Sequence, residues 1–278
     1  MRALSIVWQT NVSREISVIF YRNIEFDVVD DSTKGIYYVF GVRKSGSSIL
    51  NNIAQALAEM NGIHYVDVAG TLFAKGIRVR EWQRDANMCA LVRPGNLYGG
   101  FRDFPFGIAA QEAFSESKKM LMVRDPRDAL VSEYYSNAYS HSVPKAGETR
   151  GVMLSLRESA LGTPIDAYVL ERAAMLRQTL RDFAALKPNA CLKVIRYEDV
   201  ITRKRELLYQ LCSFYSWTIS EQQADAIVGW ADVFPEVERP TEFIRKVIPG
   251  DYREKLLPET LLSLNEFFAG EMEYFGYA

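Results

Sequence analysis

Short apolar runs alternate along this chain with longer stretches in which apolar residues recur at helical spacing. Residues 35–41 form a β-branched and aromatic run between two glycines, which is typical of a strand buried on both faces. After a glycine-bearing turn, a helix is predicted to begin at Ser47 or Ser48, either of which can cap it, and to end near Asn61. Its apolar face consists of Ile49, Leu50, Ile53, Ala54 and Leu57.

The same alternation continues along the rest of the chain. Further strands are predicted at residues 64–68, 88–92, 118–123 and 191–196. Pro126 suits the first turn of a helix that Asp125 caps and that continues through residues 129–139. Later helices are predicted at residues 165–186, 204–215, 221–230 and 258–275. Residues 144–162 are polar and contain three glycines, so a mobile loop near the site is expected there.

Strands that alternate with helices predict an α/β fold with a mostly parallel central sheet and helices on both faces. We expect a single domain over residues 1–278, because no linker or repeat divides the chain. Ligands of such sheets bind beyond the carboxyl ends of the strands. Residues 41–48 and 124–128 each follow a predicted strand, so both are expected at that edge.

Composition narrows the classes of ligand. Apolar residues make up 48% of the chain and charged residues 24%, as in an ordinary globular protein, and the formal net charge is −2. A chain without a basic excess is not expected to bind nucleic acid, so any anion must be bound by locally placed Arg and Lys side chains. The three cysteines lie far apart and suggest neither a zinc site nor a disulfide framework.

Targeting signals are not evident in the sequence. Residues 1–10 lack the apolar core and cleavage site of a secretory signal, and no apolar run approaches the roughly 18 residues that a membrane span requires. A cytoplasmic protein without a membrane partner is expected.

The loop Gly41-Val-Arg-Lys-Ser-Gly-Ser-Ser48 lies between a predicted strand and a predicted helix. Backbone N–H groups and a helix N-terminus converge on a phosphate in this setting. The spacing of the glycines matches the nucleotide-binding P-loop, but Ser47 occupies the position of its lysine and Lys44 instead precedes Gly46. The loop is therefore predicted to be P-loop-like; a simple glycine turn with solvated Lys and Arg is the alternative.

Two further segments present cations. Arg124 ends a predicted strand and Ser132 lies about two turns along the following helix, so both could contact one anion. Arg245 and Lys246 stand beside Pro249 and Gly250 in a segment without periodicity. Each arrangement is common when taken alone, and a solvated basic turn explains the second equally well.

Taken together and in this order, these segments resemble the cytosolic sulfotransferases that use 3′-phosphoadenosine 5′-phosphosulfate (PAPS). The segment 44–48 resembles the family's 5′-phosphosulfate loop, usually K-S-G-T-T, and residues 123–135 resemble its 3′-phosphate motif. Residues 196–199 are similar to the adenine-contacting segment, and residues 243–253 to the closing R-K-G-x-x-G-D-W-K segment. The resemblance runs from about residue 35 to 275.

The resemblance implies PAPS as the donor, 3′-phosphoadenosine 5′-phosphate (PAP) as the product and no metal. The implied donor-binding residues are Lys44, Ser45, Gly46, Ser47, Ser48, Arg124, Ser132, Tyr197, Arg245 and Lys246. Lys44 is expected to stabilise the leaving phosphate oxygen, and Ser132 is also placed among the catalytic residues.

The sequence departs from the family where the chemistry would occur. Ile49 stands where the family often has an adenine-stacking Trp, and Val247 replaces a glycine. The family's catalytic histidine is missing, since residues 100–105 read G-F-R-D-F-P. Asp103 is the candidate base by analogy; His64 is interpreted as a core residue.

The acceptor is expected to be a small molecule, such as a specialised bacterial metabolite, that is sulfated on a hydroxyl or a nitrogen. Its pocket is predicted to be lined by Tyr98, Phe101, Phe104, Tyr139 and His141. A P-loop kinase of a small metabolite is one alternative, although Ser47 contradicts its lysine requirement. A catalytically inactive PAP-binding protein is the other. The sequence leaves the oligomeric state open.

Overall fold

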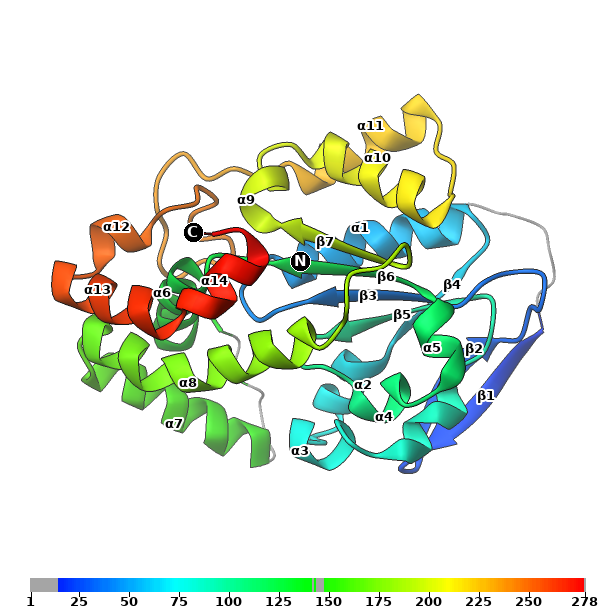
Figure 1. Ribbon diagram of the computed structural model, residues 1–278, viewed down its shortest axis with the longest axis horizontal. Helices are drawn as coiled ribbons and strands as arrows, with labels where there is room; N and C mark the ends of the chain where they lie inside the picture. Colours follow the sequence, from blue (N-terminus) through cyan, green and yellow to red (C-terminus); the bar gives the residue numbers. More distant parts are fainter. Residues whose placement is uncertain (1–14, 142, 144–147, 278) are drawn as a thin grey trace.

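Five parallel strands form the central sheet of the part of the chain that the structure describes (Figure 1). The computed structural model describes residues 15–141, 143 and 148–277. The strand order is β4-β5-β3-β6-β7, and every neighbouring pair is parallel. The strands are β3 (Tyr37–Gly41), β4 (His64–Asp67), β5 (Asn96–Phe101), β6 (Lys118–Val123) and β7 (Leu192–Arg196).

Helices cover both faces of this sheet. The helices on one side include α1 (Ser47–Met60), α10 (Lys204–Tyr215) and α11 (Glu221–Ala231). The other face packs against helices that include α2 (Val68–Ala74), α6 (Pro126–Tyr135) and α8 (Ile165–Ala184). Figure 1 shows α10 and α11 above the sheet and α8 below it. The α/β fold with a parallel sheet between helices is therefore confirmed.

Side chains alternate between the two faces, as the period of a strand requires. Tyr38 and Phe40 are fully buried on the α8 side, and Val39 is fully buried on the α1 side. The central strand β3 is apolar on both faces for this reason.

Shorter elements connect these layers. They are α3 (Val79–Trp82), the 3₁₀ helix η1 (Ala86–Leu91), α4 (Phe106–Ala109), α5 (Glu112–Glu116), the π-helix η2 (Ser136–Ser140), α7 (Glu148–Gly162), α9 (Tyr197–Val200), α12 (Tyr252–Lys255), α13 (Pro258–Phe267) and α14 (Ala269–Phe275). The helix predicted at 258–275 is thus interrupted at Phe268, and the one predicted through 139 gives way to η2 after Tyr135.

The strand predicted at residues 88–92 is wrong. Residues 86–91 form η1, because the Asp85 carboxylate accepts a hydrogen bond from the Asn87 N–H and starts a helical turn. The strand in this region is β5, whose Gly99 and Gly100 obscure its pattern. A Cβ at Gly99 would lie 2.5 Å from Asn51 Oδ1, so close packing requires the glycine there.

The mobile loop predicted at residues 144–162 is also wrong over most of its length. Residues 148–162 form α7, which buries Met153 and Ala160. Residues 144–147 lie outside the described part of the chain. The antiparallel hairpin of β1 (Ile16–Tyr21) and β2 (Ile24–Val29) was not predicted.

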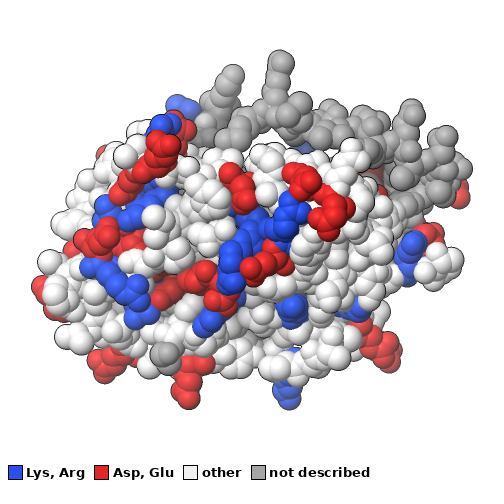
Figure 2. Space-filling model, turned by 90° about the horizontal axis from the view of Figure 1, so that it is seen from above, with Lys and Arg blue, Asp and Glu red and all other residues white. Residues whose placement is uncertain are grey.

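Charges on the face seen in Figure 2 are mixed, with basic and acidic side chains side by side rather than in fields of one sign. This pattern agrees with local rather than bulk binding of anions. Among the described residues, no helix is both long and apolar enough to cross a membrane.

Candidate functional site

The loop after β3 brings main-chain groups and one lysine to the carboxyl end of the sheet. The Ser45 hydroxyl contacts the Val42 carbonyl at 2.6 Å and the Met122 carbonyl at 3.0 Å, which ties the loop to β6. Lys44 and Gly46 adopt positive φ values of 61° and 81°. These left-handed residues turn the chain sharply into α1.

The N-terminus of α1 has no side-chain cap, so the predicted capping by Ser47 or Ser48 is wrong. Gly46 is the N-cap residue and no side chain bonds to the first turn. The first N–H groups of a helix lack internal partners, and an anion can take the place of a capping side chain. The missing cap therefore leaves the first turn available to a phosphate.

Lys44 is half-buried among other cations. Desolvation, together with the positive charges of Arg124, Arg102 and Arg245, lowers the pKa of its amino group to about 8, although the negative charge of Glu133 partly opposes them. A group that retains accessible surface yet is strongly desolvated lies in a recess of the protein. Binding of an anion there would restore the charged form of the lysine.

Arg124 lies at the end of β6 and is only 6% exposed. Its Nη1 donates to the Lys44 carbonyl at 3.1 Å, and its guanidinium lies 4.4 Å from the centre of the Tyr197 ring. Its Nε is buried without a hydrogen-bond partner among the described residues. Burying a donor without a partner is unfavourable. The unpaired Nε therefore indicates that a ligand with a hydrogen-bond acceptor binds here.

Tyr197 packs against the loop on its other side. A Cβ at Gly46 would lie 2.9 Å from Tyr197 Cδ2, and the Tyr197 hydroxyl donates to the Val247 carbonyl at 3.2 Å. One ring therefore contacts the loop, Arg124 and the segment that contains Arg245.

Asp128 fixes that last segment to α6. Its two carboxylate oxygens accept the N–H groups of Gly250 at 2.6 Å and Tyr252 at 3.0 Å. Arg245 is buried, stacks 4.1 Å from the Tyr135 ring centre, and pairs with Asp251 and Glu238. Figure 1 shows α6, α9 and α12 gathered at one end of the sheet.

Lys246 and Ser132, the other two predicted donor-binding side chains, do not take part in these contacts. Lys246 pairs with Asp251 at 2.8 Å and with Glu254 at 3.2 Å, so an incoming phosphate would compete with these carboxylates. Ser132 is half-buried on α6, and its hydroxyl makes no hydrogen bond among the described residues. Of the predicted residues, the structure brings together Lys44, Arg124, Tyr197 and Arg245. Asp128 connects their segments and was not identified from the sequence. Its position four residues after Arg124 was the available signal.

Asp103, the predicted base, follows β5. Its Oδ2 accepts a hydrogen bond from Arg43 Nη2 at 2.8 Å. Arg43 precedes Lys44 directly, so the ion pair holds Asp103 to the phosphate-binding loop. His64 lies at the other end of the sheet, where its Nε2 is 3.0 Å from the Asp27 carbonyl oxygen.

The predicted acceptor residues divide into two groups. Tyr98 and Phe101 are fully buried and Phe104 is 5% exposed, so these three rings belong to the core rather than to an open surface. The Tyr98 hydroxyl donates a hydrogen bond to the Leu91 carbonyl oxygen at 2.9 Å. Tyr139, at 40% exposure, and His141 remain accessible at the end of η2.

His141 lies beside the loop. Desolvation lowers the pKa of its imidazole, and the positive charges of Lys44, Arg102 and Arg157 lower it further. Arg157 comes from α7, the helix that the sequence did not predict, and its Nη2 donates to the His141 carbonyl oxygen.

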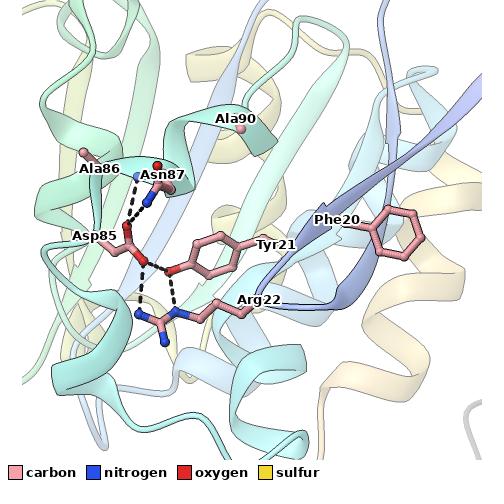
Figure 3. Close-up of a pocket in the computed structure, with 7 residues that line it drawn as sticks. All are labelled: Phe20, Tyr21, Arg22, Asp85, Ala86, Asn87 and Ala90. Carbon is pink, nitrogen blue, oxygen red and sulfur yellow. Dashed lines mark hydrogen bonds and ion pairs between the residues drawn. The ribbon is translucent and has the colours of Figure 1, made fainter.

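A separate pocket lies between the β1–β2 hairpin and η1 (Figure 3). Asp85 occupies one side of it, accepting hydrogen bonds from the Tyr21 hydroxyl at 2.9 Å and from Arg22 at 3.1 Å. None of the predicted site residues lines this pocket. Its polar groups satisfy one another, which is typical of a structural contact.

Metal-ligating side chains do not gather at the site. In the ranges that the structure describes, no group of three or more His, Cys, Asp or Glu residues could hold a metal ion.

Comparisons with known proteins give a family model and several solved structures of similar fold. The family model described as "Sulfotransferase domain" matches residues 105–276, well over half of the chain. The solved structure of mouse sulfotransferase SULT7A1 complexed with PAP is 13% identical, with a TM-score of 0.55, and the alignment covers 92% of this chain and 94% of that one. A sulfotransferase from Alicyclobacillus acidocaldarius is 15% identical over 87% of this chain and 94% of that one, with a TM-score of 0.48. A search of curated proteins finds no match.

Proposed function

The chain belongs to the sulfotransferase family, and from this premise we propose that it transfers the sulfuryl group of PAPS to a hydroxyl or nitrogen of a small-molecule acceptor. The observation that carries the proposal is the convergence of Lys44, Arg124 and Arg245 at one end of the sheet, where Arg124 contacts the Lys44 carbonyl and the Tyr197 ring. Three cations in one recess, beside an uncapped helix, suit a ligand with two separate phosphate groups.

Two features of the recess fit PAPS in particular. The buried Arg124 Nε has no partner among the described residues, and the desolvated Lys44 is held at a depressed pKa of about 8. An anionic group that binds here would give Arg124 Nε a hydrogen-bond partner and would stabilise the charged form of Lys44. In the proposed arrangement, Lys44 and the N–H groups of residues 45–48 hold the 5′-phosphosulfate, and Arg124 and Arg245 hold the 3′-phosphate, with Ser132 and Lys246 nearby.

Bound PAPS would supply the sulfuryl group, whose sulfur gains a bond to the acceptor atom as its bond to the 5′-phosphate oxygen breaks. Lys44 Nζ is the group proposed to stabilise the negative charge that develops on that oxygen. The acceptor proton is proposed to pass to the Asp103 carboxylate, which Arg43 holds beside the loop. Lys44 and Asp103 are proposed to perform these two roles without a metal ion.

Sulfate transfer is the direct test of this proposal. With PAPS and a panel of hydroxyl and amine acceptors, mass spectrometry should detect an acceptor that has gained one sulfuryl group and an equal amount of PAP. Lys44→Ala should lower kcat by about 10²-fold or more, the usual cost of losing one preorganised donor to a developing charge. Arg80→Gln, an exposed substitution on α3, is the control. PAP binding without turnover on any acceptor would instead favour the inactive PAP-binding protein.

Asp103→Asn tests the proton acceptor separately. This substitution keeps the shape of the side chain and should lower kcat by about 10²- to 10⁴-fold if Asp103 removes the acceptor proton. Its PAP affinity, measured by calorimetry, should stay close to that of the wild type. Full activity across the pH range in Asp103→Asn, with an inactive Lys44→Ala, would remove Asp103 from the mechanism.

A further inference from the structure

A second set of cationic side chains surrounds the accessible side of the recess. Arg43 belongs to the loop itself, Arg102 follows β5, and Arg157 lies on α7. Arg102 Nη2 lies 3.5 Å from Ser48 Oγ, and Arg157 Nη2 donates to the His141 carbonyl oxygen. These contacts place the two guanidiniums beside the first turn of α1 and beside the end of η2.

His141 lies within electrostatic reach of several of these groups. Its imidazole responds to the charges of Lys44, Arg102 and Arg157 together, although the three cations come from different elements. Arg102 in turn lies within electrostatic reach of Arg43, Asp67 and Asp103. The loop after β3, the end of β5, η2 and α7 therefore border one basic recess.

The carboxylates near this recess are already engaged. Asp103 pairs with Arg43, and Glu133 pairs with Arg172 at 2.7 Å. Asp67 accepts the Gly70 N–H at 2.9 Å, where it caps α2.

Arg102 and Arg157 are left without a carboxylate partner in the part of the chain that the structure describes. Arg102 is exposed and makes only hydrogen bonds of 3.4 Å and 3.5 Å, to Gly100 and Ser48. Arg157 Nε is buried and has no hydrogen-bond partner within the described ranges. A buried guanidinium donor without a partner, such as Arg157 Nε, is unfavourable unless a ligand completes the site, and the exposed Arg102 beside it is free to bind the same ligand.

We propose that Arg102 and Arg157 bind an oxyanion, a carboxylate, on the acceptor, and so direct its hydroxyl or nitrogen toward Lys44. This inference rests on the proposed function. The donor has its own binding groups in Lys44, Arg124 and Arg245, whereas α7 lies outside every donor-binding segment. Guanidinium groups are the side chains best suited to a planar carboxylate. The acceptor class is therefore hydroxy or amino acids, which narrows the small molecule that the sequence led us to expect.

The test compares ligands that differ only in charge. Melting temperatures of the full chain saturated with PAP are measured with 4-hydroxybenzoate and 4-hydroxybenzamide, and with 3-(4-hydroxyphenyl)propanoate and its amide. We expect the carboxylate of at least one pair to bind about tenfold more tightly than its amide, the effect of one charge-assisted contact. Arg102→Gln and Arg157→Gln should each abolish this preference, and Arg80→Gln should preserve it.

The same variants distinguish the acceptor site from the donor site. PAP affinity, measured by calorimetry without acceptor, should change less than about twofold in both variants, because neither arginine is assigned to PAP. A large loss of PAP affinity would overturn the proposal by assigning these arginines to the donor. Equal binding of carboxylate and amide in both pairs, or no binding of either, would also overturn it. Failure of the wild type to bind PAP would instead contradict the proposed function.

The imidazole of His141 gives a readout that does not depend on turnover. The sequence contains two histidines, so the His141 resonance can be assigned by its loss in His141→Gln. A bound carboxylate should raise the pKa of His141, because it offsets the positive charges that lower it. If the pKa of His141 stays the same with both 4-hydroxybenzoate and 3-(4-hydroxyphenyl)propanoate, the carboxylate binds elsewhere and the proposal is wrong.

Discussion

The conformation and the burial of Lys44 both lower the stability of the protein without a ligand. Its backbone φ of 61° is unusual for a residue other than glycine, and its amino group is desolvated to a pKa of about 8. Both features are unfavourable until an anion binds. They are expected where a site is built for its ligand rather than for the stability of the free chain.

Replacement of Lys44 by methionine should therefore stabilise the nucleotide-free protein. At pH 7 the folded lysine is protonated, so the cost of desolvating its charge is fully present, and we expect Lys44→Met to be more stable by about 1–3 kcal/mol. Between pH 8 and 10.5 the unfolded state binds more protons at this position than the folded state, so the stability of the wild type rises relative to the variant. Urea unfolding from pH 7 to 10.5 should show the difference shrinking. A variant that is less stable at pH 7 would contradict this view of Lys44.

Residue by residue, the donor side of the site was more predictable than the acceptor side. Lys44, Arg124 and Arg245 lie in short segments with fixed spacing, and the structure brings them together. Arg102 and Arg157 carry no such local signal, because only the tertiary fold packs α7 against η2 and brings Arg157 to His141. Tyr98 and Phe101 were misread because an aromatic residue near a site is as readily a core residue as a ligand contact.

At the scale of elements, α6 connects the two halves of the proposed donor site. Asp125 caps its first turn, as the sequence predicted, by accepting the Arg127 N–H at 3.0 Å. One turn later Asp128 accepts two N–H groups from the segment of Gly250 and Tyr252. A single helix thus sets the position of Arg124 and of the segment that carries Arg245.

Asp128→Asn tests this connection. The amide can accept at one atom only, so one of the two buried N–H groups loses its partner, and the loss should cost about 1–3 kcal/mol of unfolding free energy. PAP affinity should fall by about tenfold, since the Arg245 segment is no longer held against α6. Asp30→Asn, with a side chain 61% exposed and a long ion pair at 3.8 Å, is the matched control. Unchanged PAP affinity in a destabilised Asp128→Asn would show that the segment does not need this contact.

The elements that the sequence missed share a physical cause. In β5 the glycines are required by close approach, at Gly99 to Asn51 and at Gly100 to Asp67, and they remove the apolar signal of a strand. In α7, exposed Val152 and Leu154 and the internal Gly151 weaken the amphipathic pattern, and among its side chains that the structure describes only Met153 and Ala160 are buried. The strands and helices with continuous apolar patterns, such as β6 and α8, were predicted correctly.

At the scale of the whole molecule, the parallel sheet explains why distant segments meet. The loops after β3, β5, β6 and β7 all leave the same edge of the sheet, so residues separated by more than 150 positions, such as Lys44 and Tyr197, converge there. The net charge of −2 adds no long-range attraction for anions. The proposed recognition of the donor therefore relies on local contacts at this edge.

The central claim is that this edge binds a nucleotide with a 3′-phosphate, and calorimetric titration with PAP tests it most directly. PAP should bind, 5′-AMP should bind at least about tenfold more weakly because it lacks the 3′-phosphate, and Arg124→Ala should weaken PAP binding by about 2–4 kcal/mol. In Arg124→Ala, adenosine 5′-phosphosulfate, which also lacks the 3′-phosphate, should lose much less affinity than PAP. Binding of ATP with Mg²⁺ as tightly as PAP, with no effect of Arg124→Ala, would contradict the account and favour a kinase.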